Sequence, residues 1–201
     1  MFSALPQTVQ NELSQLATRY GQPLVRTVEL NVDRLFDPLD KNDRYGEVCM
    51  VVQRPDGHLL TMTKTFYPAG AYRLPTGGIQ HGEPVLAALL RETQEETGLA
   101  VNVERFLAAV AYRVAQSHPR PVFYTFAFLL KETGGTLGST DADERVAGFR
   151  EIWPDQLPDL ATSLAHADHH YSEEIRGRWQ SWGEFRAVIH SLVWEALQQR
   201  A

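Results

Sequence analysis

The sequence predicts a single domain of the mixed α and β class, in which strands surround a central helix and further helices are added at both ends. Two observations lead to this prediction. Extended, β-branched runs alternate along the chain with segments of helical periodicity. The 201 residues also contain no repeat, low-complexity tract or long charge block that would mark a second domain, so residues 1–201 are expected to form one unit.

The first 40 residues are expected to be a helical extension of that domain. Their apolar side chains recur at helical spacing, at Leu5, Val9, Leu13, Leu16 and Tyr20. Gly21 and Pro23 supply a stop just beyond this helix. The polar stretch from residue 32 to residue 45 is typical of a connection.

Residues 46–65 predict a β-hairpin, because the extended runs GEVCMVVQR and HLLTMTKT flank the turn Pro55-Asp56-Gly57. The glycine-rich segment 74–83 is expected to be a turn. Pro84 suits the first position of a helix, where its missing N–H would be unpaired in any case. That helix should end just before Gly98, which accepts the left-handed conformation of a helix stop.

The second half of the chain predicts more strands and a C-terminal helix. Extended runs cover residues 101–114 and 121–130, and a loop over 133–147 leads to a short strand over 149–153. The tail 172–201 carries an amphipathic apolar stripe. Because Ser181-Trp182-Gly183-Glu184 fits a capping box, this tail is expected to be one helix or two.

Charge and composition exclude several classes of protein. There are 19 Lys+Arg against 25 Asp+Glu, and a net charge of −6 argues against an extended nucleic-acid surface. No apolar run is long enough to span a membrane. The single cysteine, Cys49, and an N-terminus without the pattern of a signal peptide favour the cytoplasm. An acidic protein can still handle polyphosphates if divalent cations reverse the local field.

The helix that follows Pro84 carries the most informative pattern. Glu92, Glu95 and Glu96 stand at relative positions i, i+3 and i+4, so their carboxylates converge on one face. Three like charges repel, whereas a divalent cation turns that repulsion into ligation by oxygen. Mg²⁺ suits such a site because it keeps several waters and shares positions with phosphate oxygens. Arg91 is placed to brace Glu95 by a charge-assisted hydrogen bond.

The segment ahead of this helix supplies candidate substrate-binding residues. Glu83 lies at the helix start, where the helix dipole favours its charge. Gly77, Gly78 and Gly82 let the backbone bend tightly and approach a ligand or a cation. Gly78 and Glu83 are therefore predicted to contact the substrate.

Aromatic and cationic side chains nearby extend this prediction. Tyr72 and Arg73, with Phe66 and Tyr67, come just before the glycine-rich turn, and Arg113 lies on the following strand. Such side chains stack on a base or grip a phosphate, with a purely structural role as the alternative for each.

The spacing of these residues is that of a known motif. Gly77, Glu83 and the run Arg91-Glu92-Thr93-Gln94-Glu95-Glu96-Thr97-Gly98-Leu99 resemble the signature box of the Nudix hydrolases, over 23 of the 201 residues. Thr93 departs from the pattern, because the family has an aliphatic residue there. Thr76 likewise replaces a more usual glycine.

The resemblance implies a Nudix-like α/β/α sandwich with a mixed β-sheet. It implies Mg²⁺- or Mn²⁺-dependent hydrolysis of a pyrophosphate bond in a nucleoside diphosphate linked to another moiety, as in a nucleotide sugar, a dinucleotide or a nucleoside triphosphate. The metal ligands implied are Glu92, Glu95 and Glu96, with help from the backbone around Gly77. The chemistry implied is activation of an attacking water by the metals.

The general base is left open by the resemblance, since family members use a carboxylate in the box helix or one on a distant loop. Glu144 is the candidate on a distant loop, with a solvated acidic loop as the alternative for Asp141, Asp143 and Glu144. The predicted catalytic set comprises Arg91, Glu92, Glu95, Glu96 and Glu144.

Other functions compete with this one. A Nudix-fold sensor would bind a nucleotide without cleaving it, and a housecleaning triphosphatase for oxidised nucleotides would share the same chemistry. Among subgroups, the coenzyme A motif is not met because Thr63 replaces its arginine, and the ADP-ribose motif is unsupported because Ala115 replaces its proline. A homodimer packed through the apolar terminal helices is left open.

One histidine-rich segment is interpreted as structural. His166, His169 and His170 with Asp168 resemble a metal cluster in composition, but a polar linker before the last helix is favoured.

Overall fold

A computed structural model describes residues 2–32, 34–114 and 120–199. Ala115, the position considered for the ADP-ribose motif, lies outside these residues. The helices are α1 (Gln7–Tyr20), α2 (Val85–Thr97), α3 (Leu157–Ala165) and α4 (Trp179–Gln198), with 3-10 turns η1 (Phe2–Ala4), η2 (Ala142–Glu144) and η3 (Pro154–Gln156). The strands are β1 (Leu24–Leu30), β2 (Arg44–Gln53), β3 (Leu59–Lys64), β4 (Thr76–Gln80), β5 (Leu99–Val114), β6 (Phe123–Gly135), β7 (Val146–Ile152), β8 (Tyr171–Ser172) and β9 (Gly177–Arg178).

Seven of these strands form one mixed sheet in the order β1-β5-β6-β2-β3-β7, and β4 pairs with β2 outside this path. The pairs β1–β5 and β2–β6 are parallel, whereas the remaining pairs are antiparallel. Both β3 and β4 pair with β2, β3 near Gln53 and β4 from Arg44 to Cys49. Because the two strands pair with different parts of β2, the start of β4 and the end of β3 lie on the same side of β2.

Alternation along the central strands provides two apolar faces. Val48, Met50 and Val52 of β2 belong to one buried cluster, and Cys49 and Val51 belong to the other. Successive side chains of a strand point to opposite faces, so a continuous apolar run is buried on both sides. The predicted sandwich follows, with α1 and α2 in the first cluster and α3 and α4 in the second.

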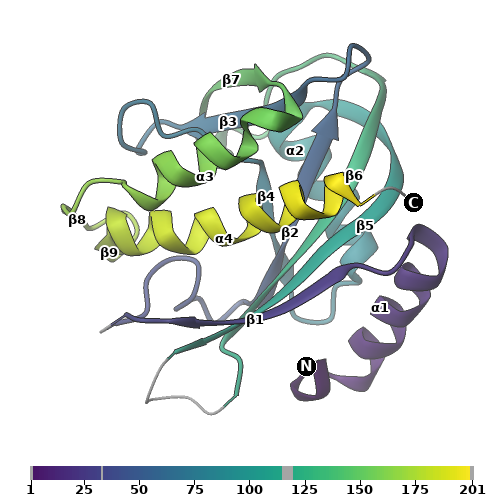
Figure 1. The fold of residues 1–201 in the computed structure, drawn as a ribbon, viewed down its shortest axis with the longest axis horizontal. Coiled ribbons are helices and arrows are strands. Elements are labelled where there is room, and N and C mark those ends of the chain that lie inside the picture. The colour runs from purple at the N-terminus through teal and green to yellow at the C-terminus, as the bar shows by residue number, and fades with distance from the viewer. Residues whose placement is uncertain (1, 33, 115–119, 200–201) are drawn as a thin grey trace.

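Helices α3 and α4 lie together over one face of the sheet (Figure 1). A Cβ atom built on Gly183 would lie 1.9 Å from the carbonyl oxygen of Leu164 on α3, so only glycine allows this approach. The tail forms a single helix that begins at Trp179, which is the first of the two alternatives that the sequence left open. Residues 171–178 form the β8–β9 hairpin instead of the first turns of that helix.

On the opposite face, α1 supplies the cap that α2 lacks. Pro84 is the N-cap residue of α2, whereas the sequence predicted it at the first helical position, one residue further into the helix. It makes no side-chain cap hydrogen bond. The carboxylate of Glu12 on α1 accepts hydrogen bonds from the backbone N–H groups of Val85 and Leu86, at 2.9 and 3.0 Å. These are two of the first N–H groups of a helix, which have no partner within it.

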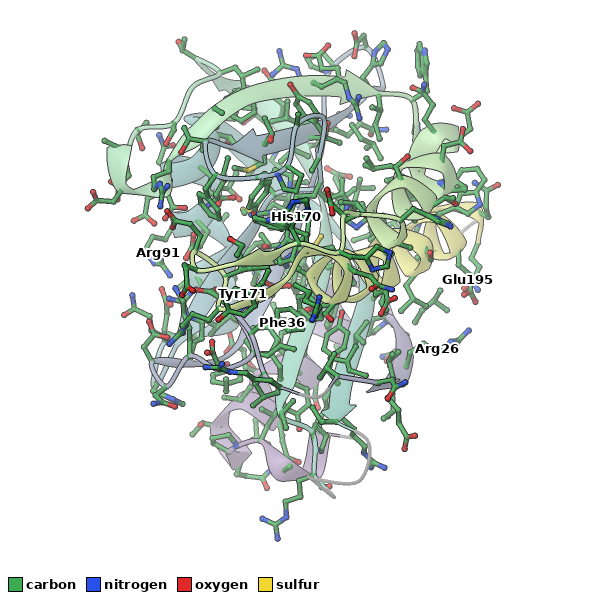
Figure 2. All side chains as sticks on the ribbon, turned by 90° about the vertical axis from the view of Figure 1, so that its left-hand side faces the viewer. Arg26, Phe36, Arg91, His170, Tyr171 and Glu195 are labelled. Carbon is green, nitrogen blue, oxygen red and sulfur yellow. The ribbon has the colours of Figure 1, made fainter. Side chains whose placement is uncertain are left out.

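Three further segments differ from the sequence prediction. Residues 24–30 of the expected helical extension form strand β1, which pairs with β5 along its length and is joined to α4 by the exposed ion pair of Arg26 and Glu195 (Figure 2). The glycine-rich turn contains strand β4, because its residues pair with β2. Helix α3 was not predicted. Within the described residues, no helix has both the length and the apolar character needed to cross a membrane.

Candidate active site

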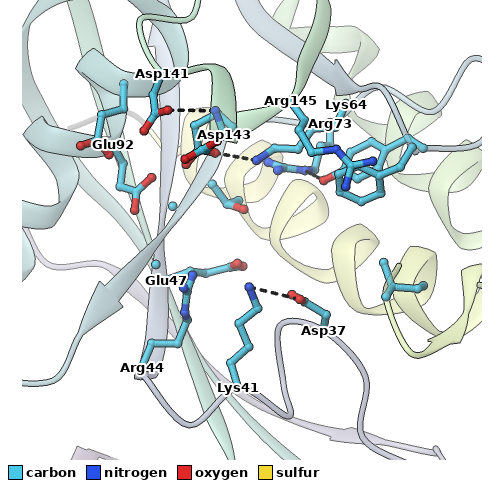
Figure 3. Close-up of a pocket in the computed structure, with 18 of the residues that line it drawn as sticks. Asp37, Lys41, Arg44, Glu47, Lys64, Arg73, Glu92, Asp141, Asp143 and Arg145 are labelled. Carbon is cyan, nitrogen blue, oxygen red and sulfur yellow. Dashed lines mark hydrogen bonds and ion pairs between the residues drawn. The ribbon is translucent and has the colours of Figure 1, made fainter. Parts of the chain in front are cut away.

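A cleft of about 590 Å³ opens where β2, β3 and β4 meet α2, and the C-terminal hairpin and α4 close its other end (Figure 3). One wall carries acidic side chains from α2 and from the η2 turn. The other wall carries cations and aromatic rings from β2, β3, α4 and the loop before β2, and its two carboxylates, Glu47 and Asp37, are paired with Arg186 and Lys41. The charged residues that line the cleft are Asp37, Lys41, Arg44, Glu47, Lys64, Arg73, Arg91, Glu92, Glu95, Asp141, Asp143, Glu144, Arg145, Glu174 and Arg186.

Three carboxylates converge on the acidic wall. One oxygen from each of Glu92, Glu95 and Glu144 lies within 4.8 Å of the others. Glu92 and Glu95 are three positions apart on α2, so the helix presents them together, as the sequence predicts. Glu144 comes from η2, where Asp141 accepts a hydrogen bond from the backbone N–H of Asp143 and shapes the turn.

Arg91 organises the α2 side of this cluster. Its Nη1 donates to Glu92 Oε1 at 2.9 Å and to Glu95 Oε2 at 2.8 Å. Its Nε donates to Glu83 Oε1 at 2.8 Å, and its Nη2 donates to the carbonyl oxygen of Gly78 at 3.0 Å. A planar guanidinium with several bonded donors has little rotational freedom. Arg91 therefore fixes both α2 carboxylates, and Glu83 fixes Arg91.

Lys64 joins the other two carboxylates. Its Nζ lies 2.7 Å from Glu144 Oε2 and 3.0 Å from Glu96 Oε1. Glu96 is completely buried behind the cleft wall. Among the described residues neither of its oxygens has a hydrogen-bond partner of good geometry, so the lysine contact is an ion pair. Glu96 thus lies beside the cluster that Glu92, Glu95 and Glu144 form.

Burial and these cations move the pKa values in opposite directions. Burial raises the pKa of Glu92 to about 7 although Arg91 acts against it, and burial also raises the pKa of Glu96. Burial acts in the same sense on Glu144, but the charge and hydrogen bond of Lys64, with Glu96 and Arg73, together outweigh it and lower the pKa of Glu144. Glu144 is therefore ionised near neutral pH, while Glu92 is held near its titration point.

Two glycines of β4 are required by their neighbours. A Cβ atom on Gly77 would lie 2.1 Å from the side chain of Glu92, and one on Gly78 would lie 2.0 Å from the guanidinium of Arg44. A side chain at either position would displace Glu92 or the guanidinium of Arg44. The glycines thus let α2 and β4 approach closely enough for Glu92 to enter the cleft.

The sequence did not reveal the buried pair at the floor of the cleft. Arg186 of α4 donates from Nη1 to both oxygens of Glu47 on β2, at 2.7 and 2.8 Å, and to Thr76 Oγ1 at 3.1 Å. A charge inside an apolar strand run and an arginine inside an amphipathic stripe are the signals that point to such a pair. Their mutual contact depends on the packing of α4 against the sheet.

Some of the predicted substrate-binding residues line the cleft, and others lie away from it. Gly78 and Arg73 line the cleft, and Arg73 is buried with its Nε bonded to the hydroxyl of Tyr67 at 2.8 Å. Glu83 does not line the cleft and instead contacts Arg91. Tyr72 stacks under Arg150 in a separate pocket beside α3.

Arg113 is exposed on β5 and is not among the residues of the cleft. It stands opposite Glu29 of β1, between Tyr112 and Val114, whose side chains point into the core. The strand therefore directs Arg113 away from the fold interior. His166, His169 and His170 are likewise exposed on the loop after α3.

Comparison with known proteins assigns a family to this chain. The NUDIX domain model matches residues 44–175. An ADP-ribose pyrophosphatase of Methanocaldococcus jannaschii is 29% identical over 74% of this chain and 82% of its own length. The NAD-capped RNA hydrolase NudC of Chromobacterium violaceum is 30% identical over 61% of this chain, and the match spans 44% of that protein. A crystal structure of UDP-X diphosphatase has a TM-score of 0.49 and 17% identity, covering 81% of this chain and 67% of that one.

A mixed sheet between two helical layers, with glutamates of one helix facing a glycine strand, defines the fold and site of a Nudix hydrolase. The NUDIX domain model covers more than half of the chain, so the chain belongs to the NUDIX family. Its enzyme class is that of the Nudix pyrophosphohydrolases.

Proposed function

We propose that this protein hydrolyses the pyrophosphate bond of a nucleoside diphosphate linked to another group, with Mg²⁺ or Mn²⁺ bound at Glu92, Glu95 and Glu144. The observation that carries the proposal is the convergence of these three carboxylates within 4.8 Å on one wall of a cleft whose other wall is cationic. The first wall suits a divalent cation, and the second suits the phosphates that accompany it.

The donor set fits such a cation. Carboxylate oxygens are the hard ligands that Mg²⁺ prefers, and one or two of them with phosphate oxygens are typical of its sites. When bound, the cation supplies Lewis-acid activation and stabilises negative charge on the phosphoryl oxygens. Glu96 lies behind the cleft wall and is linked to Glu144 through Lys64.

The residues of the chain have separable parts in the reaction. Arg91 holds Glu92 and Glu95 in place. Cationic side chains on the opposite wall, such as Arg44, are placed to neutralise the diphosphate. Water attacks one phosphorus, the bond from that phosphorus to the bridging oxygen breaks, and two phosphate monoesters leave. Glu144, which is ionised, is suited to bind the cation or to accept the proton of this water.

ADP-ribose is the first substrate to test. The archaeal relative that matches most of this chain bears the name of an ADP-ribose pyrophosphatase. The cleft of about 590 Å³ is within the range of pockets that hold ligands of this size. Hydrolysis of ADP-ribose would give AMP and ribose 5-phosphate.

Turnover with Mg²⁺ tests the proposal. The purified protein is incubated with ADP-ribose, dinucleotides, nucleotide sugars and nucleoside triphosphates, and released monophosphate is measured. Glu95→Gln should lower kcat by about a hundredfold or more, because even partners of metal ligands cost 10- to 100-fold when changed. Glu104→Gln, at an exposed position of β5, is the matched control and should leave kcat unchanged.

The same experiment distinguishes an enzyme from a sensor. Binding of a nucleotide without any product would favour the sensor and contradict the proposal. A cytoplasmic location and a homodimer stay predictions from the sequence.

A further inference from the structure

Two cations of the chain divide the carboxylates of the site between them. Arg91 contacts Glu92 and Glu95, and Lys64 contacts Glu96 and Glu144. The box helix itself supplies Arg91. Lys64 belongs instead to the end of β3 and reaches the cluster from across the cleft (Figure 3).

Arg91 and Lys64 differ in the groups that fix their positions. Arg91 also donates to Glu83 and to the carbonyl oxygen of Gly78, so its position does not depend on the cluster alone. Among the described residues, the ion pairs of Lys64 are only those with Glu96 and Glu144. Its side chain is 14% exposed and lines the cleft.

The position of Lys64 has an electrostatic consequence for the metal site. Glu144 belongs to the three-carboxylate group and also accepts a hydrogen bond from Lys64. A positive charge therefore lies within hydrogen-bond distance of one of the potential metal ligands. Two positive charges a few ångströms apart repel measurably even in water, and more strongly in a partly buried site. Bound diphosphate would offset that repulsion because it adds negative charge next to both cations.

We propose that Lys64 is a positioning residue that acts as an internal counter-ion, holding Glu144 against Glu96 and weakening divalent-cation binding until the substrate phosphates arrive. The proposal rests on the proposed function, since it concerns the same cation site. Metal and substrate then bind cooperatively, and by linkage each strengthens the binding of the other by the same factor. Lys64 is the residue that sets this coupling.

The test is the Mn²⁺ affinity of the substrate-free protein, measured by titration with detection of free Mn²⁺ by electron paramagnetic resonance. Lys64→Met should bind Mn²⁺ about tenfold more tightly than the wild type, because the repelling charge is gone. Lys64→Arg keeps the charge and should bind like the wild type. Lys64→Gln makes the same charge change as Lys64→Met but keeps a hydrogen-bond donor, and replaces it as the test if the methionine variant does not fold.

Lys41→Met is the matched control. Lys41 lines the same cleft but pairs with Asp37 at 3.2 Å, away from the carboxylates of α2. Lys41→Met removes the same charge as Lys64→Met and should change the Mn²⁺ affinity less than threefold.

The outcomes separate this inference from the proposed function. Equal or weaker Mn²⁺ binding by Lys64→Met and Lys64→Gln, with a wild type that binds Mn²⁺, would overturn the role of Lys64 alone. Failure of the wild type to bind Mn²⁺ would overturn the metal site and with it the proposed function. A comparable gain in Lys41→Met would also contradict the inference, because it would show a general effect of charge in the cleft.

Discussion

Single side chains around the cleft are held mostly by partners that are distant in the sequence. Arg186 and Glu47 are 5% and 3% exposed, so each would be an uncompensated buried charge without the other. Removing one partner of such a pair typically costs 3–5 kcal/mol. The pair therefore ties α4 to β2 at the floor of the cleft.

His190 of α4 provides a second tie of this kind. Its Nε2 accepts a hydrogen bond from the backbone N–H of Leu74 at 2.9 Å, and its Nδ1 donates to the carbonyl oxygen of Arg186 at 2.7 Å. Burial lowers the pKa of His190 to about 3, with the charge of Arg186 acting in the same sense. The neutral ring thus anchors the segment that leads into β4.

The lowered pKa of His190 predicts a pH-dependent stability. The unfolded chain takes up a proton at this histidine as the pH falls through about 6.5, whereas the folded protein does so only near 3. Between these values the unfolded state binds more protons, so stability falls as the pH falls. From pH 7 to pH 5, the free energy of unfolding should drop by about 2 kcal/mol more in the wild type than in His190→Gln.

Urea unfolding of both proteins at the two pH values measures this difference. Glu92, whose raised pKa contributes in the opposite sense, is present in both and cancels. Equal losses in the two proteins would show that His190 does not stay neutral in the fold.

Among single residues, the sequence predicts the α2 side of the site well. The i, i+3 spacing of Glu92 and Glu95 places both carboxylates on one helix face, and Arg91 within reach of Glu95. Lys64 and Arg186 are not predictable in this way, because their contacts with carboxylates form only when β3 and α4 pack beside α2 and β2.

Among the elements, α2 depends on a helix that lies outside the matched family domain. The cap of α2 comes from Glu12 of α1, whose two oxygens accept from consecutive N–H groups. The negative charge also lies at the positive end of the helix dipole. Helix α1 thus stabilises the element that carries the carboxylates.

Removing this cap should destabilise the protein. Glu12→Ala is expected to lower the free energy of unfolding by about 1–2 kcal/mol, the range for loss of an N-cap side chain together with its charge. Asn11→Ala, at an exposed neighbouring position of α1, is the control and should change stability by less than about 0.5 kcal/mol. Urea unfolding monitored by circular dichroism measures both, and an equal effect of the two variants would rule out the cap.

Element prediction succeeds where local signals agree with the fold. The β2–β3 hairpin and α2 with its left-handed stop at Gly98 follow from turn residues and periodicity. Strand β4 escaped prediction because its two glycines read as a turn, and only pairing with β2 makes it a strand. The glycine in α4 suggested a helix break, whereas it marks the crossing of α3.

The whole molecule places the site where the ends of several elements meet. Helices α1 and α2 cover one face of the sheet and α3 and α4 cover the other (Figure 1), so the terminal segments complete both layers. The cleft takes residues from β2, β3, β4, α2, η2 and α4. Its acidic wall therefore comes from α2 and η2, and its cationic wall comes from the sheet edge and α4.

Anomalous diffraction from crystals soaked in Mn²⁺ tests the metal site most directly. A peak within coordination distance of Glu92, Glu95 and Glu144, which disappears in Glu95→Gln crystals, is the expected result. A peak only beside Asp56, His58 and Glu151, a second group of potential ligands on the surface, or no peak at all, would contradict it.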